Sequence, residues 1–333
     1  MQTFDHFIAV DWAQSNMAIA RMTAKSDRVE VRDVPSDIRE LKVYLKNLKG
    51  SKIITVEEST TAQWLYTELK GEVDEILICD PRRNRLLSEG PKTDKIDADK
   101  LVRLLRAGML KPVFHSADQF IYLRKLVSGY QDTVKAGVRL KNQRSALFRA
   151  NGRSAKECDL VEPAEQFVLR GLDRGIGEYE TEKKRYEKEF EVWRKKHVMI
   201  RNLESLPGIG TINAIKVAAA VVDGHRFPAK NNFISYCGLI KHDRISGGRS
   251  YGKKRPQYNR TLKSVFKTAA LVCIDKDAKG PFKKYYDFLI NDKRYSDHNA
   301  RHSLARRIAT LAWGVMKSGK KFDERRLKTV ESK

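Results

Sequence analysis

The order of strand-like and helix-like segments in the first third of this 333-residue chain restricts its fold more than any other feature. Short apolar runs predict strands, and stretches with an apolar residue every three or four positions predict helices. The predicted strands span residues 7–11, 16–22, 28–34, 52–57 and 75–81, and the predicted helices span 36–50, 61–70 and 93–109. The close spacing of the first three strands predicts an antiparallel meander, and Ser36 is the expected cap of the first helix.

Three strands followed by helix, strand, helix, strand and helix is the order of an RNase H-like fold. We therefore predict an α/β domain of this kind over residues 1–117. In such a sheet the first and fourth strands are neighbours, so residues that end these two strands are expected to emerge at the same edge. The helix that follows the fifth strand can pack across that edge.

Four carboxylates fall where this arrangement would bring them together. Asp11 closes the first strand, and Glu57 closes the fourth. Asp94 and Asp97 are three positions apart and project from one face of the next helix. Clustered carboxylates repel unless a cation screens them, and oxygen ligands suit Mg²⁺ or Mn²⁺. We predict that these four acids form a metal-dependent phosphoryl-transfer site.

Each acid also has an ordinary explanation. Charge runs such as K-T-D-K-I-D-A-D-K at 92–100 are usually solvated helix faces, and Asp99 points away from the Asp94 side. Aspartate is common at strand ends, and Glu58 is a rival to Glu57 for the fourth position. The prediction therefore depends on the ordered set of acids and not on any single member.

The net charge of +24 is unevenly distributed. Residues 1–117 hold 19 Lys and Arg against 18 Asp and Glu, whereas residues 241–333 hold 25 against 9. A neutral first third and a strongly basic last third predict a nucleic-acid partner bound through its phosphates. No apolar run approaches the roughly 18 residues of a membrane span, so no membrane partner is expected. The start of the chain is not signal-like, and four scattered cysteines argue against disulfides and zinc, which predicts a cytoplasmic location.

Residues 118–200 show the pattern of long helices. A heptad-like stripe follows the second of them, formed by Val168, Leu172, Ile176, Tyr179, Tyr186, Phe190 and Trp193. Such a stripe is explained equally well by a helical hairpin within one monomer and by a coiled-coil seam between two copies. The sequence leaves these two alternatives open.

Residues 201–333 are mixed but mainly helical, and they contain two glycine-rich motifs. L-P-G-I-G at 206–210 is typical of a helix–hairpin–helix turn, in which Gly208 and Gly210 expose backbone N–H groups to a phosphate. A simple packing turn between two helices is the alternative. S-G-G-R-S-Y-G-K-K-R at 246–255 is predicted to be a flexible basic loop, where Ser246 has little steric hindrance from its neighbours.

Several residues of this last third are candidates for nucleic-acid contact. Besides the two glycines, the predicted phosphate-binding residues are Arg244, Arg249, Lys253, Lys254, Arg255 and Arg260. His298 and His302 are four apart on a helix, but no third ligand of matching type is evident. For this pair, phosphate contact or simple exposure is favoured over a metal site.

Taken together, these motifs resemble the DEDD-type transposases of insertion sequences, the family of RNA-guided bridge recombinases that includes the pilin-gene invertases. The matching motifs are F-I-A-V-D-W-A, T-V-E-E-S-T, T-D-K-I-D-A at 93–98, L-P-G-I-G, F-I-S-Y-C-G-L at 233–239, Ser-Gly at 246–247 and W-G-V-M-K-S-G-K-K-F-D at 313–323. They occur in the family's order across almost the whole chain. The combination is specific, although no single motif is.

The resemblance implies a Holliday-junction-resolvase-like nuclease domain over 1–117, a coiled-coil region over 118–200 and a C-terminal transposase domain over 201–333. It assigns Asp11, Glu57, Asp94 and Asp97 as Mg²⁺-binding acids. It also assigns Ser246 as a nucleophile that forms a phosphoserine with DNA. The implied partners are donor and target DNA, a noncoding guide RNA, and further copies of the chain in a tetramer built as a dimer of dimers. A hydrolytic nuclease that uses the four acids and water alone remains the alternative.

Overall fold

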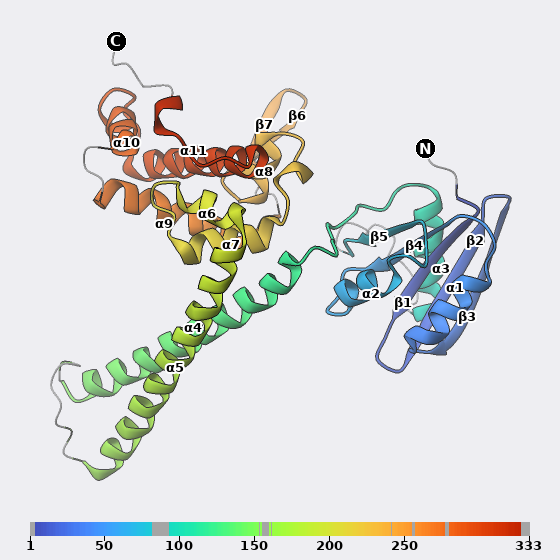
Figure 1. Cartoon of the computed structure of the whole chain (residues 1–333), viewed down its shortest axis with the longest axis horizontal. Coiled ribbons are helices and arrows are strands. Elements are labelled where there is room, and N and C mark those ends of the chain that lie inside the picture. Colours follow the sequence, from blue (N-terminus) through green and yellow to red (C-terminus); the bar gives the residue numbers. More distant parts are fainter. Residues whose placement is uncertain are drawn as a thin grey trace. The chain divides into compact units, whose positions relative to one another are not determined.

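The computed structural model describes residues 4–81, 93–152, 154, 160, 162–240, 242–254, 257–276 and 280–327. The chain separates into two compact units, residues 1–118 and residues 119–333. The first unit is a mixed α/β domain, and the second is mostly helical with one small β-hairpin (Figure 1).

A five-stranded sheet forms the centre of the first unit, in the order β3-β2-β1-β4-β5. Its strands are β1 (His6–Trp12), β2 (Asn16–Thr23), β3 (Ser26–Pro35), β4 (Lys52–Glu57) and β5 (Glu75–Cys79). The first three pair antiparallel, whereas β1 with β4 and β4 with β5 pair parallel. The predicted meander is therefore confirmed, and the neighbouring first and fourth strands agree with an RNase H-like sheet.

Helices cover both faces of this sheet, and each face has its own hydrophobic core. The helices are α1 (Ile38–Asn47), α2 (Ala62–Leu69) and α3 (Asp94–Arg106). Leu41 of α1 and Leu65 of α2 share one core with alternate residues of β1 and β4. Leu101 and Leu105 of α3 belong to the core on the other face. The period of two along a strand is what separates the two sets of side chains.

The structure shows the N-cap of α1 and the surroundings of Asp99 in α3. The expected cap of α1 is wrong by one residue: Asp37 caps the helix by accepting from the Arg39 N–H, whereas Ser36 Oγ donates to the Ala13 carbonyl. The expectation for Asp99 is confirmed, because its carboxylate pairs with Arg103 one turn along α3 at 2.9 Å.

The second unit begins with two long helices, α4 (Phe120–Ala150) and α5 (Pro163–Lys196), which pack against each other in opposite directions (Figure 1). Tyr130 of α4 meets Tyr186 and Phe190 of α5 edge to face, with ring centroids 6.1 and 5.2 Å apart. The stripe of α5 thus packs within the monomer at this end. At its other end Phe167 and Val168 are 73% and 49% exposed.

Shorter helices form the rest of the second unit. They are α6 (Val198–Glu204), α7 (Thr211–Val221), α8 (Lys230–Tyr236), α9 (Arg260–Lys276), α10 (Pro281–Asn291) and α11 (Asp297–Ser318), with short 3₁₀ turns η2 (Gly224–Arg226) and η3 (Glu324–Arg326). The long α11 packs against α6, α8, α9 and α10, and its buried Leu304, Ala305 and Ile308 supply much of the shared core. Strands β6 (His242–Ser246) and β7 (Arg249–Lys254) form a separate antiparallel hairpin.

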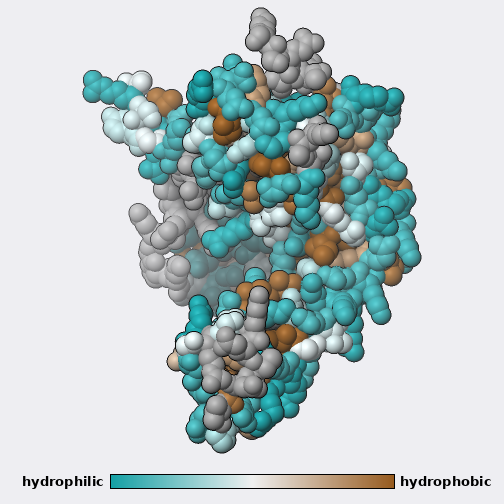
Figure 2. All heavy atoms as spheres, turned by 90° about the vertical axis from the view of Figure 1, so that its left-hand side faces the viewer, coloured by the Kyte–Doolittle hydropathy of each residue, from teal (hydrophilic) through white to brown (hydrophobic). Residues whose placement is uncertain are grey.

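The surface is predominantly hydrophilic. On the face shown in Figure 2 hydrophobic residues form only small separate patches. Within the described ranges, no helix is both long enough and apolar enough to cross a membrane. Cys79, Cys237 and Cys273 are buried, as expected, whereas Cys158 lies outside the described residues.

Candidate functional site

The alternation of side chains along β1 and β4 determines where Asp11 and Glu57 point. Val10 and its parallel partner Val56 both pack into the core beneath α1 and α2. Because successive residues of a strand face opposite sides, Asp11 and Glu57 are directed toward the face that α3 covers. The register also sets them level with each other, since each directly follows one member of the Val10–Val56 pair.

The first turn of α3 supplies the other two acids. Thr93 caps the helix by accepting from the Ile96 N–H, so α3 begins at Asp94 and includes Asp97 in its first turn. Negative charge near a helix N-terminus is favourable in itself, which gives both acids a structural role as well. Since α3 packs against β1 and β2, this turn lies toward the carboxyl end of β1, where Asp11 is found.

The electrostatics show that three of the predicted acids are close enough to interact. Partial burial raises the pKa of Asp11 above its ordinary value, and the negative charges of Asp94 and Asp97 raise it further. Among the described residues, no cation is a cause of this shift. Within the described part of the chain, no group of three or more Asp, Glu, His or Cys side chains is arranged so that it could hold a metal ion as it stands.

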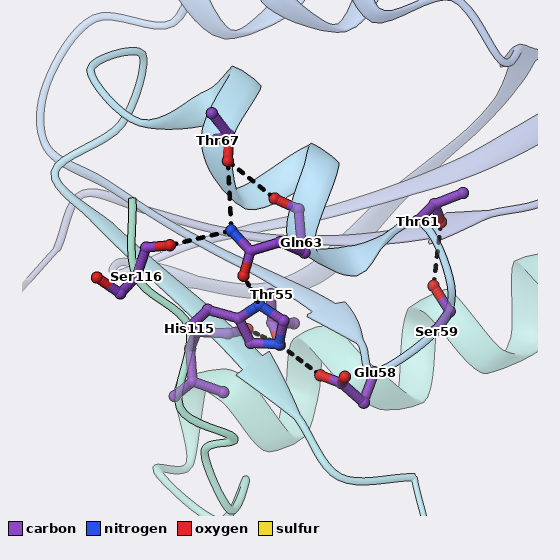
Figure 3. A network of polar contacts seen from close by, with 9 residues as sticks. Thr55, Glu58, Ser59, Thr61, Gln63, Thr67, His115 and Ser116 are labelled. Atoms are coloured by element: carbon purple, nitrogen blue, oxygen red, sulfur yellow. Dashed lines mark hydrogen bonds and ion pairs between the residues drawn. The ribbon is translucent and has the colours of Figure 1, made fainter. Parts of the chain in front are cut away.

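A polar network at the end of β4 includes Glu58, the residue after Glu57 (Figure 3). The buried ring of His115 lies with Nε2 2.5 Å from Glu58 Oε2 and Nδ1 2.8 Å from Gln63 Oε1. Gln63 donates its amide N–H to the Ser116 carbonyl, so its oxygen must be the atom that faces His115. Because the Gln63 oxygen can only accept, Nδ1 of His115 donates to it, and Nε2 faces Glu58.

This network distinguishes the surroundings of Glu58 from those of Glu57. Glu58 is engaged by His115 on the α2 side, whereas Glu57 is the strand residue that points to the α3 side. Sequence reasoning did not single out His115. A histidine that follows M-L-K-P-V-F at 109–114 gives little signal, because its partner Glu58 is 57 positions away in the sequence.

Ser246 lies in the second unit, and the structure corrects the prediction of its surroundings. The segment around it was predicted to be a flexible loop, but it forms the β6–β7 hairpin. Gly247 and Gly248 have φ of 54° and 75° and make the two-residue turn. Left-handed φ at both turn positions matches the right-handed twist of a hairpin, and glycine adopts it without strain.

Two arginines of the hairpin are neighbours of Ser246. Ser246 pairs with Arg249 across the turn, and Arg244 is two residues earlier on the same strand. Directly paired residues share a face of a hairpin, so Arg249 lies on the Ser246 side. The ladder is irregular between Asp243 and Ile245, where Arg244 lies. All three residues are exposed. This face of the hairpin is suited to approach by a phosphate.

The other candidate phosphate-binding residues differ in their surroundings. Lys253 is exposed and lies 3.9 Å from Asp243, and the exposed Arg260 begins α9. The Lys254 side chain and Arg255 lie outside the described residues.

The two glycines of L-P-G-I-G also differ from each other. Gly208 has φ of 76°, and a Cβ there would collide with the Ala269 carbonyl oxygen of α9. Gly208 is therefore required for packing between helices. Gly210 is the N-cap of α7, with open space around the position of a Cβ. Of the two, only Gly210 combines a helix N-terminus with room for a ligand.

Comparisons with known families cover both units. A family model for DEDD transposases of the IS110 type, described as a transposase, matches residues 8–150. A second, for the transposase IS116/IS110/IS902 family, matches residues 200–287. The chain belongs to this family of DEDD-type insertion-sequence transposases. The matched ranges include all four acids and Ser246.

Individual relatives agree with this membership. The chain is 26% identical over 166 residues to the insertion element IS110 protein of Streptomyces coelicolor, covering 49% of this chain and 40% of the relative. It is 30% identical over 121 residues to the insertion element IS116 protein of Streptomyces clavuligerus, covering 36% and 30%. A candidate transposase of Sinorhizobium fredii is 25% identical over 264 residues, covering 72% and 64%. The match thus spans less than two thirds of the length of each relative.

Proposed function

We propose that this protein is a DNA recombinase that mobilises an insertion sequence, and that its four acids bind a divalent metal ion, Mg²⁺ or alternatively Mn²⁺. The observation that carries the proposal is the mutual repulsion of Asp11, Asp94 and Asp97 at the sheet edge where Glu57 also ends. Like charges gathered on a rigid scaffold raise the free energy of the folded state unless a cation binds there. Family membership supports the same assignment.

The donor set fits a hard divalent cation. Asp11, Glu57, Asp94 and Asp97 supply only carboxylate oxygens, and Mg²⁺ and Mn²⁺ prefer such ligands. When bound, the metal would neutralise charge on the phosphate and on the departing oxygen. The protein's contribution is to hold the acids on one edge, with Glu58 kept out of the set by His115.

Ser246 is the proposed nucleophile. Its Oγ bonds to phosphorus while the bond from phosphorus to the sugar oxygen breaks, and the hydroxyl proton passes to that departing oxygen. Because a phosphodiester is exchanged for another phosphodiester, a second DNA hydroxyl can reverse the step on a new strand. Arg244 and Arg249 beside Ser246 would hold the phosphate in place for this attack.

The proposal includes the assembly and the partners that the family resemblance implies. The acids and Ser246 belong to different units, so a complete site must combine the two, and we propose that different subunits of a tetramer supply them. Exposed Val168 on the stripe of α5, with exposed Phe167 beside it in the sequence, supports a coiled-coil contact between copies. Donor and target DNA in the bacterial cytoplasm are the substrates, and a noncoding guide RNA selects them.

The experiment that tests the proposal is capture of the covalent intermediate. The protein is incubated with Mg²⁺, guide RNA and labelled DNA that contains the element's ends, then denatured and separated by size. Wild-type protein should retain label through a bond to Ser246, and Ser246→Ala should lose both the adduct and strand exchange. Ser250→Ala is the control and should keep both activities. Ser250 follows Arg249 on β7 and pairs with Ile245.

The same assay distinguishes the serine mechanism from the hydrolytic alternative. A nuclease that uses the acids and water would still cut DNA after Ser246→Ala, because water replaces the serine hydroxyl. Undiminished cleavage by that variant, without any adduct from the wild-type protein, would overturn the serine mechanism and leave the acid site in place.

A further inference from the structure

A basic cavity lies at the base of the β6–β7 hairpin, apart from the face that carries Ser246. Its volume is about 330 Å³, at the small end of the range of ligand sites. The hairpin, α9 and α11 all contribute to its walls. Its basic lining residues are Lys253, Lys263, Lys267, His298, His302 and Arg306.

Four of these side chains are permanent cations, and none of the described residues that line the cavity carries a carboxylate. Concentrating like charges in a concave, partly desolvated space is unfavourable unless an anion enters it. Two of the cations are held in position: Lys263 lies over the Tyr258 ring, 4.5 Å from its centroid, and Arg306 donates to Ser303 Oγ at 3.1 Å. Lys263 is partly buried, whereas Lys253, Lys267 and Arg306 are exposed, so the positive charge at the cavity is accessible to an anion from solvent.

The pKa of His302 reflects the positive charge around the cavity. Its Nε2 lies 2.9 Å from the Leu239 carbonyl, which can only accept, so this nitrogen carries a hydrogen. Burial lowers the pKa of His302, and the charges of Arg306, Lys267 and His298 lower it further, against the opposing effect of the Leu239 bond. The ring of His298 is parallel to it, with centroids 6.4 Å apart. A bound anion would stabilise the protonated ring and reverse this shift.

We propose that this cavity binds a backbone phosphate of a nucleic-acid strand that continues from the Ser246 hairpin. The ligand class rests on the proposed function, whereas the anion preference rests on the cavity alone. Lys253 pairs with Asp243, three residues before Ser246. At roughly 3.3 Å per strand residue this separation is about 10 Å, or about three nucleotides of a B-form strand. The site would hold the strand in register beside the reacting phosphate.

The first test uses inorganic phosphate as the probe and His302 as the reporter. Side-chain NMR of ¹⁵N-histidine-labelled protein follows the titration of His302 with and without phosphate. Phosphate should raise the pKa of His302, and Lys267→Gln with Arg306→Gln should remove the response. If phosphate leaves the His302 titration unchanged while shifting other histidines, the cavity is not an anion site and the proposal fails.

The second test measures the dependence of nucleic-acid affinity on salt. Lys267→Gln with Arg306→Gln should lower the slope of log affinity against log salt by about 1, because the one phosphate contact at the cavity is lost. Lys276→Gln with Lys317→Gln changes the same net charge at exposed positions of α9 and α11 outside the cavity. This matched control should change the slope by less than half as much.

Separate arms with DNA and with RNA identify the strand. A reduced slope with DNA or with RNA supports the proposal and shows which of the two nucleic acids the cavity binds. If the cavity variant and the control variant have equal slopes with DNA and also with RNA, the proposal is overturned. Ser246→Ala separates this result from the proposed function. That variant should keep the full salt slope while it loses strand exchange, so either proposal can fail without the other.

Discussion

The acid site of the first unit and the Ser246 hairpin of the second unit are built in opposite ways. Asp11 and Glu57 end neighbouring strands of a five-stranded sheet with a core on each face, so packing determines their direction. Ser246 sits beside a two-glycine turn on a two-stranded hairpin whose described side chains are exposed. Rigid support suits a site that must hold repelling charges together. An open hairpin suits a nucleophile that has to reach a phosphate on a large substrate.

The largest effect should come from removing one acid without changing its shape. Asp97→Asn keeps the first turn of α3 but removes a metal ligand, and strand exchange should fall by at least about 100-fold. Adduct formation in the capture assay measures the loss. Asp99→Asn on the same helix is the control, because Asp99 pairs with Arg103 and should affect activity less than about twofold. Equal activities of the two variants would refute the metal-site assignment.

A substitution in the hairpin tests whether its geometry matters as much as its serine. Gly247→Val forces a β-branched residue into φ near 54°, which costs about 1–3 kcal/mol. Strand exchange should fall about 5- to 30-fold, while metal binding by the first unit is unchanged. Gly247→Asn should retain most activity, because asparagine tolerates the left-handed region. A fully active Gly247→Val variant would show that the turn conformation has no part in catalysis.

The network behind Glu57 should give a smaller effect. His115→Ala removes the ring that contacts both Glu58 and Gln63, so the end of β4 loses these two contacts. Unfolding free energy of the first unit should fall by about 1–3 kcal/mol, and turnover by a few-fold with little change in DNA affinity. Hydrogen exchange of the β4 amides measures the loosening. His225→Ala, which breaks an exposed pair with Asp223, should have neither effect.

A change in DNA affinity with unaltered β4 exchange would contradict this role. His115 would then act on the substrate directly and not through the position of Glu57.

How far the sequence predicts these features depends on the range of the interactions involved. The sheet order and the directions of Asp11 and Glu57 follow from the order of elements and from strand alternation, which are local and periodic. The partnership of His115 with Glu58 joins residues 57 positions apart and leaves no periodic signal. The hairpin was missed because polar and basic residues hide its strands, although Gly247-Gly248 is a turn signal in itself. Gly208 matched a motif, but its proximity to α9 could not be read from one segment.

The smallest expected effect is on the stability of the metal-free protein. It tests the repulsion among the acids without measuring catalysis. The folded pKa of Asp11 is raised, so the folded state binds more protons than the unfolded state in the pH range between the two pKa values. Stability therefore decreases as pH rises through this range, and the full penalty is present at pH 7. Asp11→Asn should raise the unfolding free energy of the metal-free protein at pH 7 by about 0.5 kcal/mol, allowing for solvent screening.

The same substitution should give no gain at pH 3, where the carboxyl is protonated in both states. Thermal unfolding followed by circular dichroism at the two pH values measures the difference, and Asp99→Asn, which loses an ion pair, should be slightly less stable at pH 7. Mg²⁺ should stabilise the wild-type protein and have little effect on Asp11→Asn, because the cation removes the repulsion that the substitution has already removed. A loss of stability at pH 7 on Asp11→Asn would mean that the carboxylate is held by favourable contacts, and the acids would then need no metal to be tolerated.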